Sequence, residues 1–142
     1  MKISARNVLE GKVQNVTKGA VNAEVTLVLA GGDDIVAIIT NSSVDSLGLQ
    51  EGKPAFAIVK ASEVIVGKGL DGARLSARNV LAGDVTNLLD GAVNGEVAIG
   101  LAGGSVVIAS ITKVSMRALG LQIGDRVSAI VKASNVMIGV PA

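Results

Sequence analysis

The sequence predicts an all-β protein made of two tandem copies of one small domain. Residues 3–67 and 75–139 align without a gap and are identical at roughly half of their positions, far beyond coincidence. Stretches of alternating apolar and polar residues between glycine-containing turns are typical of short strands. Hydrophobic residues make up 49% of the chain and aromatic residues only 1%, so Val, Ile, Leu and Ala must fill the core.

The duplication divides the chain into a first domain (1–68), a linker (69–74) and a second domain (75–142). The linker is short and contains glycine, so we expect the two domains to be adjacent. Domains of about 65 residues with such small core side chains bury little surface alone, which favours an oligomer.

Each element of the first copy has a local signal. Alternation and turn residues predict five strands, at residues 3–16, 21–29, 35–40, 55–60 and 64–66. Between the third and fourth strands, Asn41, Ser42 and Ser43 can cap a single helical turn that Gly48 closes. A helix between the third and fourth of five strands matches a Greek-key barrel of the OB type, and the second copy repeats this order.

The composition excludes several classes of function. The chain has no His and no Cys, so the usual ligands for a metal and the usual groups of a catalytic triad are absent. We therefore expect a binding protein rather than an enzyme, with no cofactor and no direct metal ligands. Two acids that persist in both copies, Glu24 and Glu96, are interpreted as solvated strand residues.

Charge and hydropathy narrow the choice of partners. A net charge of +1 and a single aromatic residue, Phe56, argue against a nucleic-acid groove. No apolar run is long enough to cross a membrane, and the N-terminus does not resemble a secretory signal. We expect a cytoplasmic protein that binds neither nucleic acid nor membrane.

Two repeated motifs combine cations with hydroxyl groups. Ser4-Ala5-Arg6-Asn7 recurs as residues 76–79, and alternation along a strand would put Ser and Arg on one face. Val59-Lys60-Ala61-Ser62 recurs as residues 131–134, where a strand ends and backbone N–H groups become free to donate. Both motifs could bind an anion. The alternatives are an exposed polar edge strand for the first and a lysine extended into solvent for the second.

A third motif, Gly19-Ala20-Val21-Asn22, recurs as residues 91–94. It fits either a hairpin turn or a backbone nest for a second anion, and the turn is the better default. The preceding residue is Lys18 in one copy and Asp90 in the other, so no fixed charge accompanies the motif.

In this order and spacing, the three motifs resemble the Mop domain of molybdate-binding proteins, and two such domains in one chain resemble the di-domain molbindins. The resemblance implies OB-like domains, a homotrimer, and molybdate or tungstate bound for intracellular storage and homeostasis. Its principal oxyanion sites correspond to Ser4, Arg6, Lys60, Ala61 and Ser62, and to Ser76, Arg78, Lys132, Ala133 and Ser134. A second class of site corresponds to Ala20, Val21 and Asn22, and to Ala92, Val93 and Asn94.

The residues also fit molybdate on chemical grounds. This dianion presents four equivalent oxygens and no proton at neutral pH, so a site made only of donors suits it. An effector-sensing or structural OB module is an alternative function, and a nucleic-acid binder is a weaker one.

Overall fold

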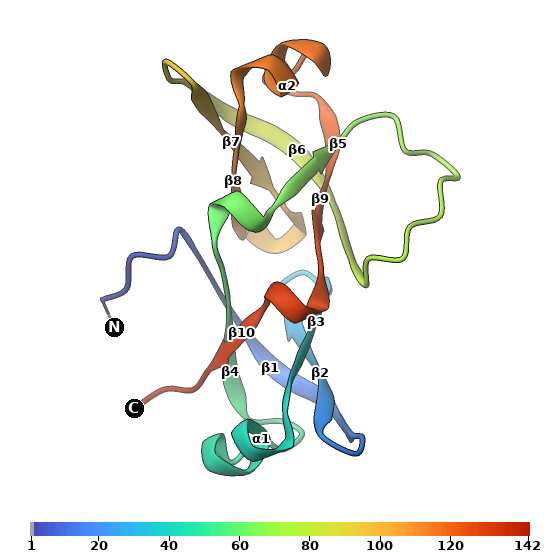
Figure 1. Cartoon of the computed structure of the whole chain (residues 1–142), viewed down its shortest axis with the longest axis vertical. Coiled ribbons are helices and arrows are strands. Elements are labelled where there is room, and N and C mark those ends of the chain that lie inside the picture. Colours follow the sequence, from blue (N-terminus) through green and yellow to red (C-terminus); the bar gives the residue numbers. More distant parts are fainter. Residues whose placement is uncertain (1) are drawn as a thin grey trace.

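The computed structural model describes residues 2–142 as two lobes stacked along the long axis of the molecule (Figure 1). The sheet of the first lobe has the order β10-β4-β1-β2-β3 and consists of β1 (Asn7–Lys18), β2 (Asn22–Leu29), β3 (Asp34–Thr40), β4 (Pro54–Val59) and β10 (Met137–Gly139). The sheet of the second lobe has the order β5-β9-β6-β7-β8 and consists of β5 (Ile65–Gly67), β6 (Asn79–Asp90), β7 (Asn94–Gly100), β8 (Val106–Thr112) and β9 (Arg126–Val131). The predicted fold class, two OB-like β domains, is confirmed.

Each lobe carries one short α-helix, which lies in the sequence between the third and fourth strands of the repeat. These are α1 (Asn41–Leu47) and α2 (Lys113–Ala118), and single 3-10 turns form η1 (Ala61–Glu63), η2 (Ala102–Gly104) and η3 (Ala133–Asn135). Gly48 closes α1 in the left-handed conformation, as predicted. The N-cap is one residue earlier than predicted, because the Thr40 hydroxyl at the strand end accepts the backbone N–H of Ser43 at 3.1 Å.

The lobes are offset from the sequence repeats by one strand. After β4 the chain crosses through η1 to the second lobe, where β5 pairs with β9, and after β9 it crosses back through η3 so that β10 pairs with β4. As a result, each repeat ends in the sheet of the other. Figure 1 shows these two crossings side by side between the lobes, with the linker on one side and both chain termini on the other.

The cores are apolar and small in side-chain volume, as the composition predicts. Val25, Leu27 and Ala37 are completely buried in the first lobe, and Val97, Ile99 and Ala109 are their counterparts in the second. Between the lobes, two glycine turns pack against each other, and a Cβ on Gly31 would lie 2.5 Å from the carbonyl oxygen of Ala102. Among residues 2–142, no helix is long and apolar enough to span a membrane.

Candidate functional site

The candidate site of the second repeat is a cavity of about 240 Å³. Its lining includes all five residues that the resemblance indicates for this repeat, together with Ala77 and with Ile38 of the first repeat: Ser76, Arg78, Lys132, Ala133 and Ser134. Two cations and two hydroxyl groups therefore surround one hollow. Such a donor set can neutralise and hydrogen-bond an anion without any metal ligand.

The antiparallel pairing of strands brings the two motifs together. Asn79, the first residue of β6, pairs with Val131, the last residue of β9, so the segment before β6 lies beside the segment after β9. In the first repeat, Asn7 pairs with Val59 in the same way. The register thus places the segment that ends at Arg6 beside the segment that begins at Lys60, but the cavity that Arg6 lines includes none of Ser4, Lys60, Ala61 and Ser62.

One expectation about this region is wrong. The alternation predicted that Ser4 and Arg6 would lie on one face of a strand. Instead, residues 4–6 precede β1, and residues 76–78 precede β6. The strands begin only at Asn7 and Asn79, where ladder pairing starts. The serine and arginine are therefore carried by an irregular, exposed segment, and from it each arginine reaches the opposite lobe.

The two asparagines that follow these segments connect the lobes. Asn79 accepts the N–H of Val36 at 2.7 Å and donates to its carbonyl at 2.8 Å, and Asn7 makes the same pair of bonds with Ile108. Each side-chain amide thus forms, with one residue of the other repeat, the pair of hydrogen bonds that a neighbouring strand would form. Both asparagines are 1% exposed, a role that the sequence reasoning missed because a polar residue at a strand start indicates a turn or cap as readily as a core position.

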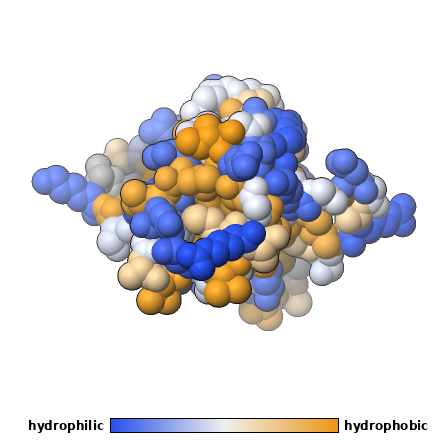
Figure 2. All heavy atoms as spheres, turned by 90° about the horizontal axis from the view of Figure 1, so that it is seen from above, coloured by the Kyte–Doolittle hydropathy of each residue, from blue (hydrophilic) through white to orange (hydrophobic). Residues whose placement is uncertain are grey.

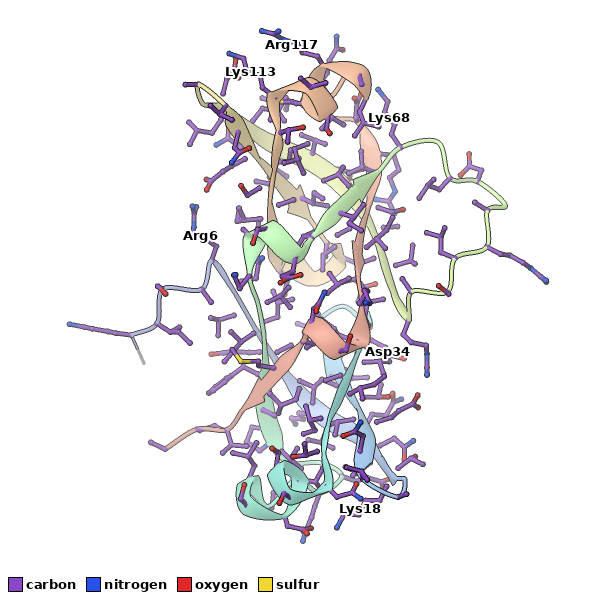
Figure 3. The ribbon with its side chains drawn as sticks, in the orientation of Figure 1. Arg6, Lys18, Asp34, Lys68, Lys113 and Arg117 are labelled. Carbon is purple, nitrogen blue, oxygen red and sulfur yellow. The ribbon has the colours of Figure 1, made fainter. Side chains whose placement is uncertain are left out.

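Glu24 and Glu96 are not simply solvated strand residues. Arg78 forms an ion pair with Glu24 on β2, and Arg6 forms one with Glu96 on β7, so each arginine is bonded to a carboxylate of the other repeat. Figure 3 shows Arg6 extending from the N-terminal segment alongside the second lobe. By contrast, Lys60 and Lys132 take part in none of the ion pairs formed within the described chain.

The first-repeat arginine also lines a smaller hollow. Arg6, Glu96 and Ile108 belong to a cavity of about 150 Å³ on the second lobe. On the first lobe, Glu24 pairs in register with Ile38, which lines the cavity that holds Arg78. Both arginines therefore lie over the outer face of the opposite sheet, next to an acid.

The third motif forms the hairpin between the first two strands of each repeat. The Gly19 N–H donates to the Asn22 carbonyl at 2.7 Å, while the Ala20 and Val21 positions are exposed. In the second repeat, the corresponding residues are exposed too: Ala92, Val93 and Asn94. The two hairpins lie at opposite ends of the long axis of the molecule, near α1 and α2 (Figure 1).

Within the described residues, no group of three or more His, Cys, Asp or Glu side chains could hold a metal ion. The donors of the clusters and the N–H groups of the first residues of η1 and η3, which have no partner inside so short a turn, can bind an anion instead.

Comparisons with known proteins agree on one group. The family described as the TOBE domain matches residues 3–66 and 75–138. The molybdenum-pterin-binding protein MopA of Rhodobacter capsulatus is 43% identical over 141 residues, which cover 99% of this chain and 53% of that protein. Molybdenum-pterin-binding protein 2 of Clostridium pasteurianum is 50% identical over 66 residues, which cover 46% of this chain and 97% of that protein. This chain therefore spans about half the length of MopA.

Among solved structures, the cytoplasmic molybdate-binding protein ModG with molybdate bound has a TM-score of 0.96 and 49% sequence identity, and the match covers 99% of this chain and 100% of that chain. These relatives are described as binding proteins, in agreement with the prediction of a binding protein rather than an enzyme.

Proposed function

Because this chain belongs to the TOBE domain family, we propose that it is a cytoplasmic protein that binds molybdate, and tungstate of similar shape, for storage and homeostasis of the metal. The observation that carries the proposal is the single cavity lined by Ser76, Arg78, Lys132, Ala133 and Ser134. The relatives named for molybdenum-pterin and molybdate binding support the choice of anion.

The equivalent site of the first repeat would use Ser4, Arg6, Lys60, Ala61 and Ser62. Arginine and lysine supply the charge, since charge-assisted hydrogen bonds are about twice as strong as neutral ones. The serine hydroxyls and the N–H groups of Ala61 and Ala133 would bond the remaining oxygens. The hairpin residues Ala20, Val21 and Asn22, with Ala92, Val93 and Asn94, would form a second class of site through backbone donors.

We also propose that the chain assembles into a homotrimer. Large apolar side chains are exposed over the described surface, among them Val21 (71%), Val93 (75%) and Val114 (76%). Figure 2 looks onto the α2 end and shows apolar side chains between the polar ones on that face. An assembly that covers these residues would bring the hairpins of several subunits together, which is what a backbone-donor site needs.

The donor set should also select among oxyanions. Molybdate and tungstate should bind much more tightly than sulfate, and phosphate should bind worst. Monohydrogen phosphate would turn an O–H towards donors only, which costs about 1 to 3 kcal/mol for the unsatisfied group. Sulfate has shorter bonds to oxygen and would leave some donors out of reach. Competition titrations against bound molybdate measure this order, and displacement by equimolar sulfate or phosphate would contradict it.

The main test combines inductively coupled plasma mass spectrometry with native mass spectrometry of the purified full chain. We expect molybdenum to co-purify with a trimer from cells supplied with molybdate. A protein that retains no molybdenum and shows no heat of binding on titration with sodium molybdate would contradict the proposed function. A monomer that binds molybdate would contradict only the trimer.

A further inference from the structure

The arginine of each candidate site is already bonded to an anion that belongs to the protein. Arg78 donates from Nη1 to Oε1 of Glu24, and Arg6 donates from Nη1 to Oε2 of Glu96. The same arrangement occurs in both halves of the molecule, always with the acid from the other repeat. Glu24 lies on β2 and Glu96 lies on β7, and each contacts the arginine of the irregular segment of the other repeat.

Glu96 lines the cavity that contains Arg6, and Glu24 contacts Arg78 at the cavity of the second repeat. Glu24 is the direct cross-strand neighbour of Ile38, and Ile38 lines the same cavity as Arg78 and Lys132. Side chains of direct neighbours on adjacent strands project from the same face of the sheet. A dianion in this cavity would therefore meet a fixed negative charge at its edge.

The cluster of the second repeat contains charges of both signs. Arg78 and Lys132 provide two positive charges, and Glu24 offsets one of them. Arg78 and Glu24 have half-exposed side chains, 50% and 43%, and exposed ion pairs of this kind contribute little to stability. The acid thus matters less for folding than for the charge that an incoming dianion encounters.

On the basis of the proposed function, we propose that Glu24 and Glu96 are built-in counter-anions, which lower the affinity for the oxyanion at the arginine of the opposite repeat. When the site is empty, the carboxylate occupies Nη1 of the arginine and offsets its charge. When an oxyanion binds, it must share or displace this contact and remains close to the carboxylate. The acid therefore sets an affinity weak enough for the anion to be released.

The test replaces each acid by its neutral isostere, in Glu24→Gln and Glu96→Gln, within the full chain. Glutamine keeps an oxygen that accepts the arginine N–H but removes the charge, so the fold should be retained. Glu51→Gln is the matched control, because it removes the same charge from an exposed turn residue that forms no ion pair within the described chain. Isothermal titration with sodium molybdate at low and at physiological ionic strength gives the affinities.

We expect Glu24→Gln and Glu96→Gln each to bind molybdate about tenfold more tightly at low salt, with a smaller gain at physiological salt because ions screen the removed repulsion. Glu51→Gln should change the affinity less than about twofold under the same screening. If wild-type protein binds molybdate and the two variants bind it equally or more weakly, the carboxylate charges do not lower the affinity and this inference is wrong. If neither wild type nor the variants bind molybdate, the proposed function fails and this inference fails with it.

Discussion

The cation clusters and the hairpins are both repeated motifs, yet they differ in how the two copies treat charge. The clusters contain the same Ser, Arg, Lys, Ala and Ser in both repeats, and each arginine faces a glutamate. At the hairpins the charges differ: Lys18 pairs with Asp45 of α1 at 2.5 Å, while Asp90, at the position equivalent to Lys18, pairs at 3.5 Å with Lys113 of α2, whose equivalent in α1 is Asn41. Figure 3 shows Lys18 and Lys113 at opposite ends of the molecule.

This difference separates two kinds of requirement. Keeping every charge in the clusters is what a function of the charges themselves requires, whereas the hairpins keep only an ion pair to the helix, formed from different helix positions in the two repeats. The two ends are still not equivalent, because Arg117 lies on α2 where α1 has Asp45. If the hairpins bind anions through their backbone, the α2 end should attract them more strongly.

The largest effect is expected on the free energy of unfolding, from Asn79 at the end of the Ser-Ala-Arg-Asn motif. Asn79→Ala leaves the buried N–H and carbonyl of Val36 without partners, so the free energy of unfolding should fall by about 2 to 4 kcal/mol. Chemical denaturation measures this change. Asn15→Ala, at an exposed strand position, should change it by less than about 0.5 kcal/mol. Equal stability of the two variants would show that the amide bridge between the lobes is unimportant.

The next effect concerns the clusters. Arg78→Ala, Lys132→Ala, Arg6→Ala and Lys60→Ala should each weaken molybdate binding more than tenfold, because each removes a charge-assisted donor worth about 1.5 to 3 kcal/mol. Lys18→Ala at the hairpin should weaken it much less. Calorimetry on variants with intact oligomers gives the ranking. A hairpin variant that loses as much affinity as the cluster variants would contradict the claim that the clusters are the principal sites.

The ion pairs between the hairpins and the helices should contribute little to stability. Reversing Lys18 or Asp45 alone places like charges together and should lower the free energy of unfolding by at most about 1 kcal/mol, and reversing both should restore it. A double-mutant cycle measured by thermal unfolding tests this reading. Independent effects of the two reversals would show that the residues do not act as a pair.

Two further ion pairs, Lys68–Asp125 and Arg126–Asp84, lie within the second lobe. The Lys68 ammonium, which bonds Asp125 at 3.0 Å, lowers the pKa of that carboxyl group, and a hydrogen bond from the Gln122 N–H lowers it further. The unfolded chain therefore binds this proton more readily than the folded one. The stability from the pair is present above the unfolded pKa and is lost as the pH falls through the folded pKa. Wild type should exceed Asp125→Asn in stability at neutral pH, and the small difference should vanish in acid.

Much of the fold follows from the sequence because local signals agree within each repeat. The strands β2 and β3 and the closing glycine of α1 can be predicted from single segments, and the anion-binding role of the clusters stays a prediction. The strand exchange cannot, since Ile65-Val66-Gly67 and Met137-Ile138-Gly139 have similar patterns that suit either sheet. The buried role of Asn7 and the Arg6–Glu96 pair depend on that arrangement of the lobes, so no local pattern reveals them.

The most direct test of the proposed sites is a crystal structure of the protein with molybdate, with anomalous scattering used to locate molybdenum. We predict anomalous peaks within hydrogen-bonding distance of the Arg78, Lys132 and Ser134 side chains, and at Arg6, Lys60 and Ser62 in the other repeat. Molybdenum that occupies the protein only away from both clusters would contradict the account.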